Sequence, residues 1–129
     1  MKQGHNTVIP PNAPTQAGVL SKAVVRVAIN LDLSQKELSE IVGSSKSEIS
    51  RLFNKTTLIS PDTKEGECAL LLIRLCRSLD ALLGDDERQC QEWFKNYNSH
   101  LGAKPIEMSK RIEGLVEIVI YLDAMRGLA

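Results

Sequence analysis

Serines and cations are concentrated in one short window of the sequence, between residues 45 and 55. They recur at the spacing of a helix, which would gather them on one outward face. Arginine can form paired hydrogen bonds with guanine, serine can bond a base edge, and lysine can hold a phosphate. We therefore predict that this face enters the major groove of DNA. Its members, with Gln35 added as a contact to the DNA backbone, are Gln35, Ser45, Lys46, Ser47, Ser50, Arg51 and Lys55.

Two short helices, predicted over residues 34–42 and 45–54, would position this face. Gly43 can adopt the left-handed conformation that ends a helix and turns the chain. Ser39 is small enough for the second helix to cross over the first. The two helices therefore form a predicted helix-turn-helix. The side chains expected to hold it together are Leu38, Val42, Ile49 and Leu52.

Each of these helices also carries a start signal. Ser34 lies three residues before Glu37, and Ser45 lies three residues before Glu48. This is the spacing of a capping box, in which the two residues bond each other's backbone amides. We expect a capping box at both helices.

A plain helical hairpin with a solvated, serine-rich face is the alternative interpretation. The combination of a small Ser39, Gly43 four residues later and the β-branched Ile49 six beyond that is more demanding. We therefore favour DNA binding. The window resembles the helix-turn-helix of the phage-repressor-like, or Xre, family, closely over residues 35–52 and loosely over residues 17–83.

Helical periodicity continues through the rest of the chain, and no stretch alternates for long enough to predict a strand. The Ser60-Pro61-Asp62 step should start the longest helix, which is apolar almost all round and should be central. Asp85 and Asp86 should start the next one, because carboxylates are stabilised at a helix N-terminus. The remaining expected helices are 15–31, 61–83, 85–98, 105–108 and 111–125.

The expected fold class is all-α, with two small domains that share an interface. Residues 1–16 should form a flexible arm, and residues 17–60 the helix-turn-helix DNA-binding region. Residues 61–129 should form a small helical domain that binds a partner or dimerises.

The last predicted helix is apolar over most of its circumference. We expect one of two seams to pack on the core around Trp93 and Phe94, and the other to meet a partner chain. The alternative is that both seams belong to the core. One seam is Ile112, Leu115, Val116, Val119 and Leu122, the other is Ile118, Tyr121, Met125 and Leu128, and a narrow polar strip holds Glu113 and Glu117.

The second half resembles the toxin-binding domain of Xre-type antitoxins, the Xre/MbcA/ParS domain, which partners RES-domain toxins. The resemblance covers roughly residues 70–129 and rests on Trp93, the run from Leu101 to Pro105, and Gly114 in the last helix. Ala103 stands where the family often has a second glycine.

This resemblance implies a homodimeric antitoxin that represses its own operon by binding operator DNA. It also implies that the C-terminal end blocks the NAD-handling cleft of a RES-domain toxin. Arg126 could compete there with the phosphates of a dinucleotide. The implied inhibitory residues are Tyr121, Met125, Arg126, Gly127, Leu128 and Ala129.

The net charge of the chain is zero, but its distribution is uneven. The first 60 residues hold seven Lys or Arg and four Asp or Glu, and the remainder hold nine and twelve. A local cluster of cations is enough to neutralise phosphates. The first half therefore carries the predicted DNA surface. With no secretory signal and no apolar run of the roughly 18 residues that span a bilayer, we expect a cytoplasmic protein.

Few residues could support catalysis or bind a metal. Cys68, Cys76 and Cys90 lack the CxxC spacing of a zinc site and are odd in number, so we expect reduced thiols. His5 and His100 are the only histidines, and no catalytic motif accompanies them. We predict neither an enzyme nor a bound cofactor or metal.

Two other hypotheses remain open at this level. The chain could be a stand-alone repressor whose second half only dimerises or senses a small ligand. It could also be a helical adaptor that has lost DNA binding.

Overall fold

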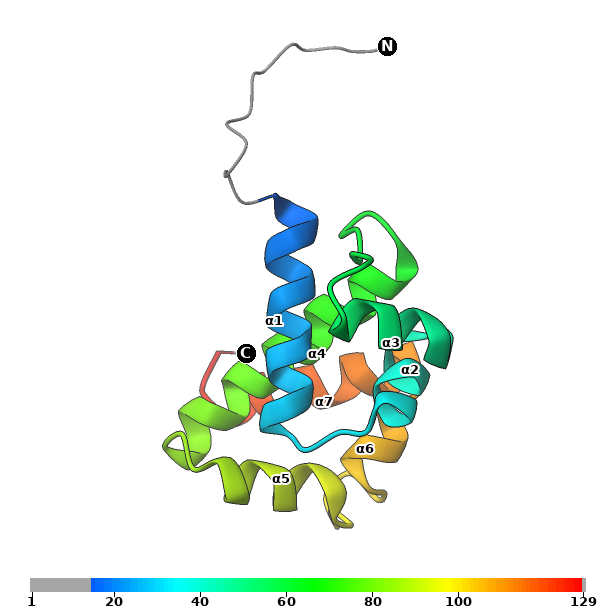
Figure 1. Ribbon diagram of the computed structural model, residues 1–129. Coiled ribbons are helices and arrows are strands. Elements are labelled where there is room, and N and C mark those ends of the chain that lie inside the picture. The colour runs from blue at the N-terminus through cyan, green and yellow to red at the C-terminus, as the bar shows by residue number, and fades with distance from the viewer. Residues whose placement is uncertain (1–14, 129) are drawn as a thin grey trace.

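The computed structural model describes residues 15–128, which fold into α-helices joined by short turns (Figure 1). The predicted fold class, all-α, is confirmed. Of the predicted arm, residues 1–14 lie outside the described residues, as does Ala129, while Thr15 and Gln16 begin the first helix. The helices are α1 (Gln16–Asn30), α2 (Gln35–Val42), α3 (Lys46–Phe53), α4 (Lys64–Leu83), α5 (Glu87–Lys95), α6 (Pro105–Met108) and α7 (Ile112–Met125).

Helix α4 is the centre of the molecule, as its apolar sequence predicts. It packs against α1, α2, α5 and α7, and Figure 1 shows it crossing behind α1. Its buried face includes Leu72, Leu75 and Leu79, which are almost wholly inaccessible to solvent. Leu70 faces outward, so the apolar surface of this helix is not entirely covered. No helix within residues 15–128 combines the length and the apolar character needed to cross a membrane.

Local start signals set most helix boundaries. The Ser34 hydroxyl accepts a bond from the Glu37 amide, and the Glu37 carboxylate accepts one from the Ser34 amide, which confirms the first capping box. At α3 only half of the expected box forms: Ser45 caps the Glu48 amide, but the Glu48 carboxylate turns to Arg51 instead. Arg51, one turn along the helix, thus replaces the Ser45 backbone amide as the partner of the Glu48 carboxylate.

Replacing Ser34 by alanine is expected to lower the free energy of unfolding by about 0.5 to 2 kcal/mol, the usual cost of losing an N-cap. Both bonds of the box depend on Ser34 holding the first turn of α2. Ser99→Ala, at an exposed position outside the helices, serves as the control and should change stability little. Denaturant unfolding monitored by circular dichroism measures both; equal stabilities would contradict this role for Ser34.

The start of α4 differs from its prediction. Thr63, rather than the Ser60-Pro61-Asp62 step, caps the helix by accepting a bond from the Gly66 amide. The Thr63 hydroxyl donates to the Ser60 carbonyl, so the preceding step forms a turn that packs against the helix. Gly66 allows this close approach, because a Cβ there would lie 2.8 Å from the Pro61 Cα.

Helix α5 is shorter than predicted, because it ends at Lys95 instead of Asn98. The chain then forms an isolated antiparallel bridge between Asn98 and Ala103, closed by the Asn98 amide on the Ala103 carbonyl. The Asn98 side chain also accepts bonds from the His100 and Leu101 amides. This turn leaves Tyr97 exposed, while Phe94, one turn earlier, is fully buried.

The predicted division of α7 into one buried and one exposed seam is wrong. The buried face takes members from each seam, namely Leu115, Ile118, Val119 and Leu122. Ile112 and Val116, assigned to the same seam as Leu115, are partly exposed, as is Ile120, which belonged to neither seam. An apolar stripe remains uncovered on this helix, but its members are not those expected.

Candidate functional site

The outer face of α3 is built as the sequence predicts. Ile49 and Leu52 are buried against the rest of the molecule, which turns the opposite side of the helix to solvent. Gly43 has a φ of 77°, the left-handed conformation that the turn between α2 and α3 requires. Ser39 is buried where the helices meet, and Leu38 and Val42 complete the contact.

The predicted DNA-binding side chains are not equally accessible. Lys46, Ser47 and Arg51 are exposed, whereas Gln35 and Ser50 are half-buried. The Ser45 hydroxyl accepts a bond from the Glu48 amide and therefore caps α3. Lys55 is exposed just beyond the helix, with a left-handed backbone (φ 62°). The structure thus brings together a compact group of cations and hydroxyls on one surface.

Glu48 is a member of this surface that the sequence analysis placed only in a cap. Its carboxylate forms an ion pair with Arg51, whose guanidinium also bonds the Ser47 hydroxyl at 3.3 Å. The pair is exposed, so it orients Arg51 without adding much stability. The three-residue spacing from Glu48 to Arg51 is the sequence signal that could have predicted it.

Lys22 is another residue that the sequence did not assign to this surface. It lines a hollow of about 300 Å³ between α1 and the segment that follows α3, together with Lys55. The two lysines are 33 positions apart in the sequence, so only the packing of α1 on this segment brings them together. They extend the positive surface beyond α3.

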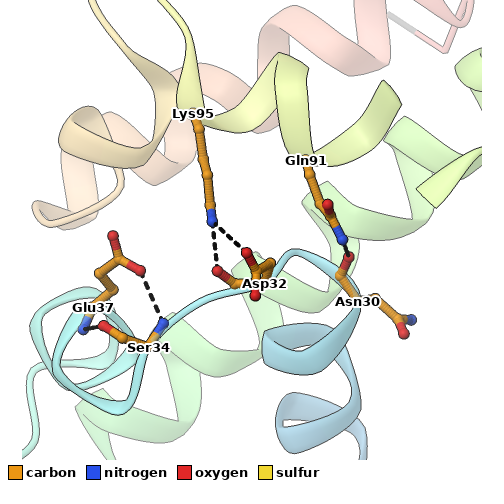
Figure 2. Close-up of polar contacts among 6 residues, drawn as sticks. All are labelled: Asn30, Asp32, Ser34, Glu37, Gln91 and Lys95. Atoms are coloured by element: carbon orange, nitrogen blue, oxygen red, sulfur yellow. Dashed lines mark hydrogen bonds and ion pairs between the residues drawn. The ribbon is translucent and has the colours of Figure 1, made fainter. Parts of the chain in front are cut away.

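Helix α5 braces the segment that leads into the helix-turn-helix. Figure 2 shows the Gln91 amide donating to the Asn30 carbonyl at 2.9 Å, and Lys95 contacting both the carbonyl and the carboxylate of Asp32. Asp32 has a positive φ of 54°, and these bonds hold it at the turn before α2. The helix-turn-helix is therefore supported by the second half of the chain.

A second brace joins α2 to the turn after α6. Lys110 forms ion pairs with Glu40 at 3.2 Å and with Glu107 at 3.1 Å. The hydrogen bonds to Glu107 and Glu40 raise the pKa of the Lys110 ammonium group, so it stays charged at neutral pH.

The residues proposed to inhibit a toxin are spread over two sides of the C-terminal end. The Tyr121 hydroxyl lies 3.3 Å from the His100 ring nitrogen, in the turn after α5. Arg126 points the other way, toward α4, where it donates to the Ser78 hydroxyl at 3.1 Å. Met125 and Leu128 are exposed.

The chain folds back after α7 instead of extending away from it. Gly127 has a φ of 74°, and the Leu128 amide bonds the Asp123 carbonyl at 2.8 Å. The end of the described chain is thus compact, with two exposed apolar side chains and Arg126 beside α4.

The cysteines behave as small apolar residues. Cys76 and Cys90 are buried and Cys68 is half-buried, and none forms a disulfide. Burial, aided by the neighbouring Asp80, raises the pKa of Cys76 to about 12 and that of Cys90 to about 11. These two thiols are protonated at neutral pH and are poor nucleophiles. Within residues 15–128, no group of His, Cys, Asp or Glu is arranged to hold a metal ion.

Comparisons with known proteins give matches to both halves of the chain. The model of the antitoxin Xre-like helix-turn-helix domain matches residues 10–74, half of the chain. The model of the antitoxin Xre/MbcA/ParS C-terminal toxin-binding domain matches residues 78–127. No curated protein sequence matches the chain. The two matches meet inside α4, the helix that packs on both α1 and α7.

Proposed function

The chain belongs to the Xre-type antitoxins, and from this membership we propose that it neutralises a RES-type toxin and represses its own operon. The combination of a DNA-binding and a toxin-binding domain in one chain is the observation that carries this proposal. An antitoxin with both domains can inhibit its toxin and control the amount of toxin made.

DNA is the partner that the surface of α3 fits. Lys46, Ser47 and Arg51 are exposed there, with Lys22 and Lys55 close by. Helix-turn-helix proteins bind two-fold symmetric operators as dimers, one recognition helix in each half-site. We therefore propose that a homodimer binds a palindromic operator. Since operator DNA lies in the cytoplasm, we propose that the protein acts there.

A RES-type toxin is the proposed protein partner, with its NAD-handling cleft blocked by the C-terminal end of this chain. Met125 and Leu128 supply exposed apolar contacts, and Tyr121 and Arg126 lie on either side of them. For Arg126 to enter an anion-binding cleft it must leave Ser78. The bond joins an exposed guanidinium to the buried Ser78 hydroxyl, so contacts of Arg126 in the cleft must offset its loss.

We propose no catalytic activity for this chain. The matched families are not enzyme families. The thiols of Cys76 and Cys90 are held protonated by burial, as described above.

Deleting residues 126–129 tests the toxin-binding part of the proposal. We expect the truncated protein to inhibit NAD consumption by the purified toxin at least about tenfold less well, a loss of about 1.4 kcal/mol of binding free energy. The physical reason is that Arg126 and Leu128 are removed while α7 stays complete.

Arg88→Ala is the control, because Arg88 is an exposed arginine on α5, distant from α7 in the chain. It should inhibit the toxin as the unmodified chain does. Circular dichroism verifies that both variants are folded. Full inhibition by the truncated chain would overturn the proposed role of the C-terminal end. Failure of the full chain to co-purify with the toxin encoded beside it would favour a stand-alone repressor.

A further inference from the structure

One face of the molecule carries an unusual share of exposed apolar side chains. They come from α1, α4 and α7 and are between 38% and 63% exposed. Single exposed apolar residues are ordinary, but a cluster of them marks a contact surface. We call this surface the α4 face; its members are Val19, Leu70, Ile112, Val116 and Ile120.

The first half of the α4 face is a groove between α1 and α4. Its volume is about 780 Å³, and its walls are mostly apolar, formed by residues such as Val19, Ala23, Leu70 and Ile73. The polar groups at its rim include three cations: Arg74, Arg77 and Arg126. Among the residues that the structure describes, no carboxylate lines the groove. Arg77 forms no ion pair with any residue from 15 to 128. The groove therefore suits an apolar segment with negative charge beside it.

The second half of the α4 face is a stripe along α7. Ile112, Val116 and Ile120 follow each other at four-residue intervals, which places them on one side of the helix. Glu113 and Glu117 are exposed next to them. Glu113 is ion-paired with Arg111 at 3.5 Å, whereas Glu117 has no ion-pair partner among residues 15–128. The stripe is thus apolar with the negative charge of Glu117 beside it, which is the chemistry that the groove would bind.

Leu70, Arg74 and Arg77 are exposed on α4 and border the groove; we call them the α4 ridge. Arg74 lines the groove and also forms an ion pair with Asp123, one turn after Ile120 in α7. A stripe cannot fold into the groove of its own chain, because α7 is packed on α4 through its buried face. The stripe can therefore bind a groove only if that groove belongs to a second copy of the chain.

We propose that the α4 face joins two copies of this chain, with the α7 stripe of each copy seated in the α1–α4 groove of the other. A two-fold axis near the α4 ridge would form the contact twice, as in other dimers whose copies use the same patch. Glu117 of one copy would then face Arg77 of the other, the two charges that have no ion-pair partner among residues 15–128 of their own chain. This inference rests on the proposed homodimer and specifies its interface.

This arrangement leaves the DNA-binding surface free. Val19, Leu20 and Ala23 of α1 line the groove, whereas Ser21, Lys22 and Val25 of the same helix line the hollow beside the end of α3. The two surfaces are therefore on different sides of α1. In Figure 1, α3 and the C-terminus lie on opposite sides of α1. A dimer formed through the α4 face would keep both recognition helices accessible.

Sedimentation of the full chain over a range of concentrations tests the proposal. Ile120→Asp should weaken dimer formation at least about tenfold, because it places a charge in an apolar contact twice per dimer. Ile29→Asp is a matched control: Ile29 is 64% exposed and Ile120 63%, but Ile29 is on α1 and outside the groove. The control should dimerise as the unmodified chain does.

A charge exchange makes the test specific to the pairing. Arg77→Glu and Glu117→Arg should each weaken the dimer, since each puts like charges opposite one another. The chain with both substitutions should dimerise several-fold better than either single variant. Its recovery would also show that the single variants had not simply failed to fold.

Three results would overturn the proposal. The first is an unmodified chain that stays monomeric at all concentrations, and the second is a double variant no better than the single ones. The third is a loss of toxin binding by Ile120→Asp with the dimer intact, which would assign the face to the toxin. The first two results come from sedimentation alone and do not depend on toxin inhibition or operator binding, so the wider functional proposal succeeds or fails separately.

Discussion

Arg51→Ala is expected to weaken operator binding by about 1 to 3 kcal/mol, roughly 5- to 150-fold, if its guanidinium bonds a base edge. Arg51 is exposed on α3 and is oriented by the Glu48 carboxylate and the Ser47 hydroxyl. Gel shifts on the upstream promoter, repeated at several salt concentrations, provide the measurement. A base contact should also relax specificity at one position of the operator.

The salt dependence separates the two roles that Arg51 could have. If it grips only a phosphate, the affinity should fall by a similar factor on every sequence, and the slope against salt should drop by about one. Arg88→Ala is the matched control, because Arg88 is also exposed and paired with a glutamate on its own helix, yet lies on α5. Unchanged affinity of Arg51→Ala would remove Arg51 from the interface.

Gly114→Ala is expected to lower the free energy of unfolding by about 3 kcal/mol, the upper end of the usual cost of overpacking. A Cβ at Gly114 would overlap the Met108 carbonyl oxygen and lie 2.6 Å from its carbonyl carbon. This obstacle is backbone, so it cannot rotate away as a side chain could. The first turn of α7 would have to move from α6.

Thermal unfolding is a direct check, with an expected loss of roughly 10 °C in Tm for a chain of this size. Gly18→Ala is the matched control in α1, because the nearest atom to its new Cβ is the Thr15 hydroxyl at 3.0 Å, the end of a side chain. It should alter stability by no more than about 1 kcal/mol. Equal stability of the Gly114 and Gly18 variants would show that α7 can shift at little cost.

Contacts between the two halves of the chain link the position of the helix-turn-helix to the toxin-binding domain. Gln91 and Lys95 of α5 hold the turn at Asn30 and Asp32, and Lys110 bonds Glu40 of α2. The helix-turn-helix is therefore bonded to the second half of the chain at two places. The position of α2 and of the turn before it depends on contacts with the second half of the chain.

Features that depend on contacts within one helical turn could be predicted from the sequence alone. The capping box of Ser34 with Glu37 and the left-handed turn at Gly43 are of this kind. So is the outward face of α3, because the buried Ile49 and Leu52 leave only one side for the cations. In these cases the partners are close in the chain, so their spacing largely decides the contact.

The choice of a cap needed more than spacing. Ser60, Asp62 and Thr63 can all cap a helix, and the packing of Gly66 against the preceding turn selects Thr63. Similarly, Glu48 could have bonded the Ser45 amide or Arg51, and it bonds Arg51. Where several partners lie within reach, the sequence predicts a set of candidates without ranking them.

Only the tertiary structure decided which side of α7 is buried. Most positions of that helix are apolar, so the period of 3.6 residues cannot distinguish the face that packs on α4 from the stripe at Ile112, Val116 and Ile120. The approach of Lys95 to Asp32, 63 residues away in the chain, has no local signal either. Long-range packing brings such groups together, because burial of the shared core sets their positions and their own spacing does not.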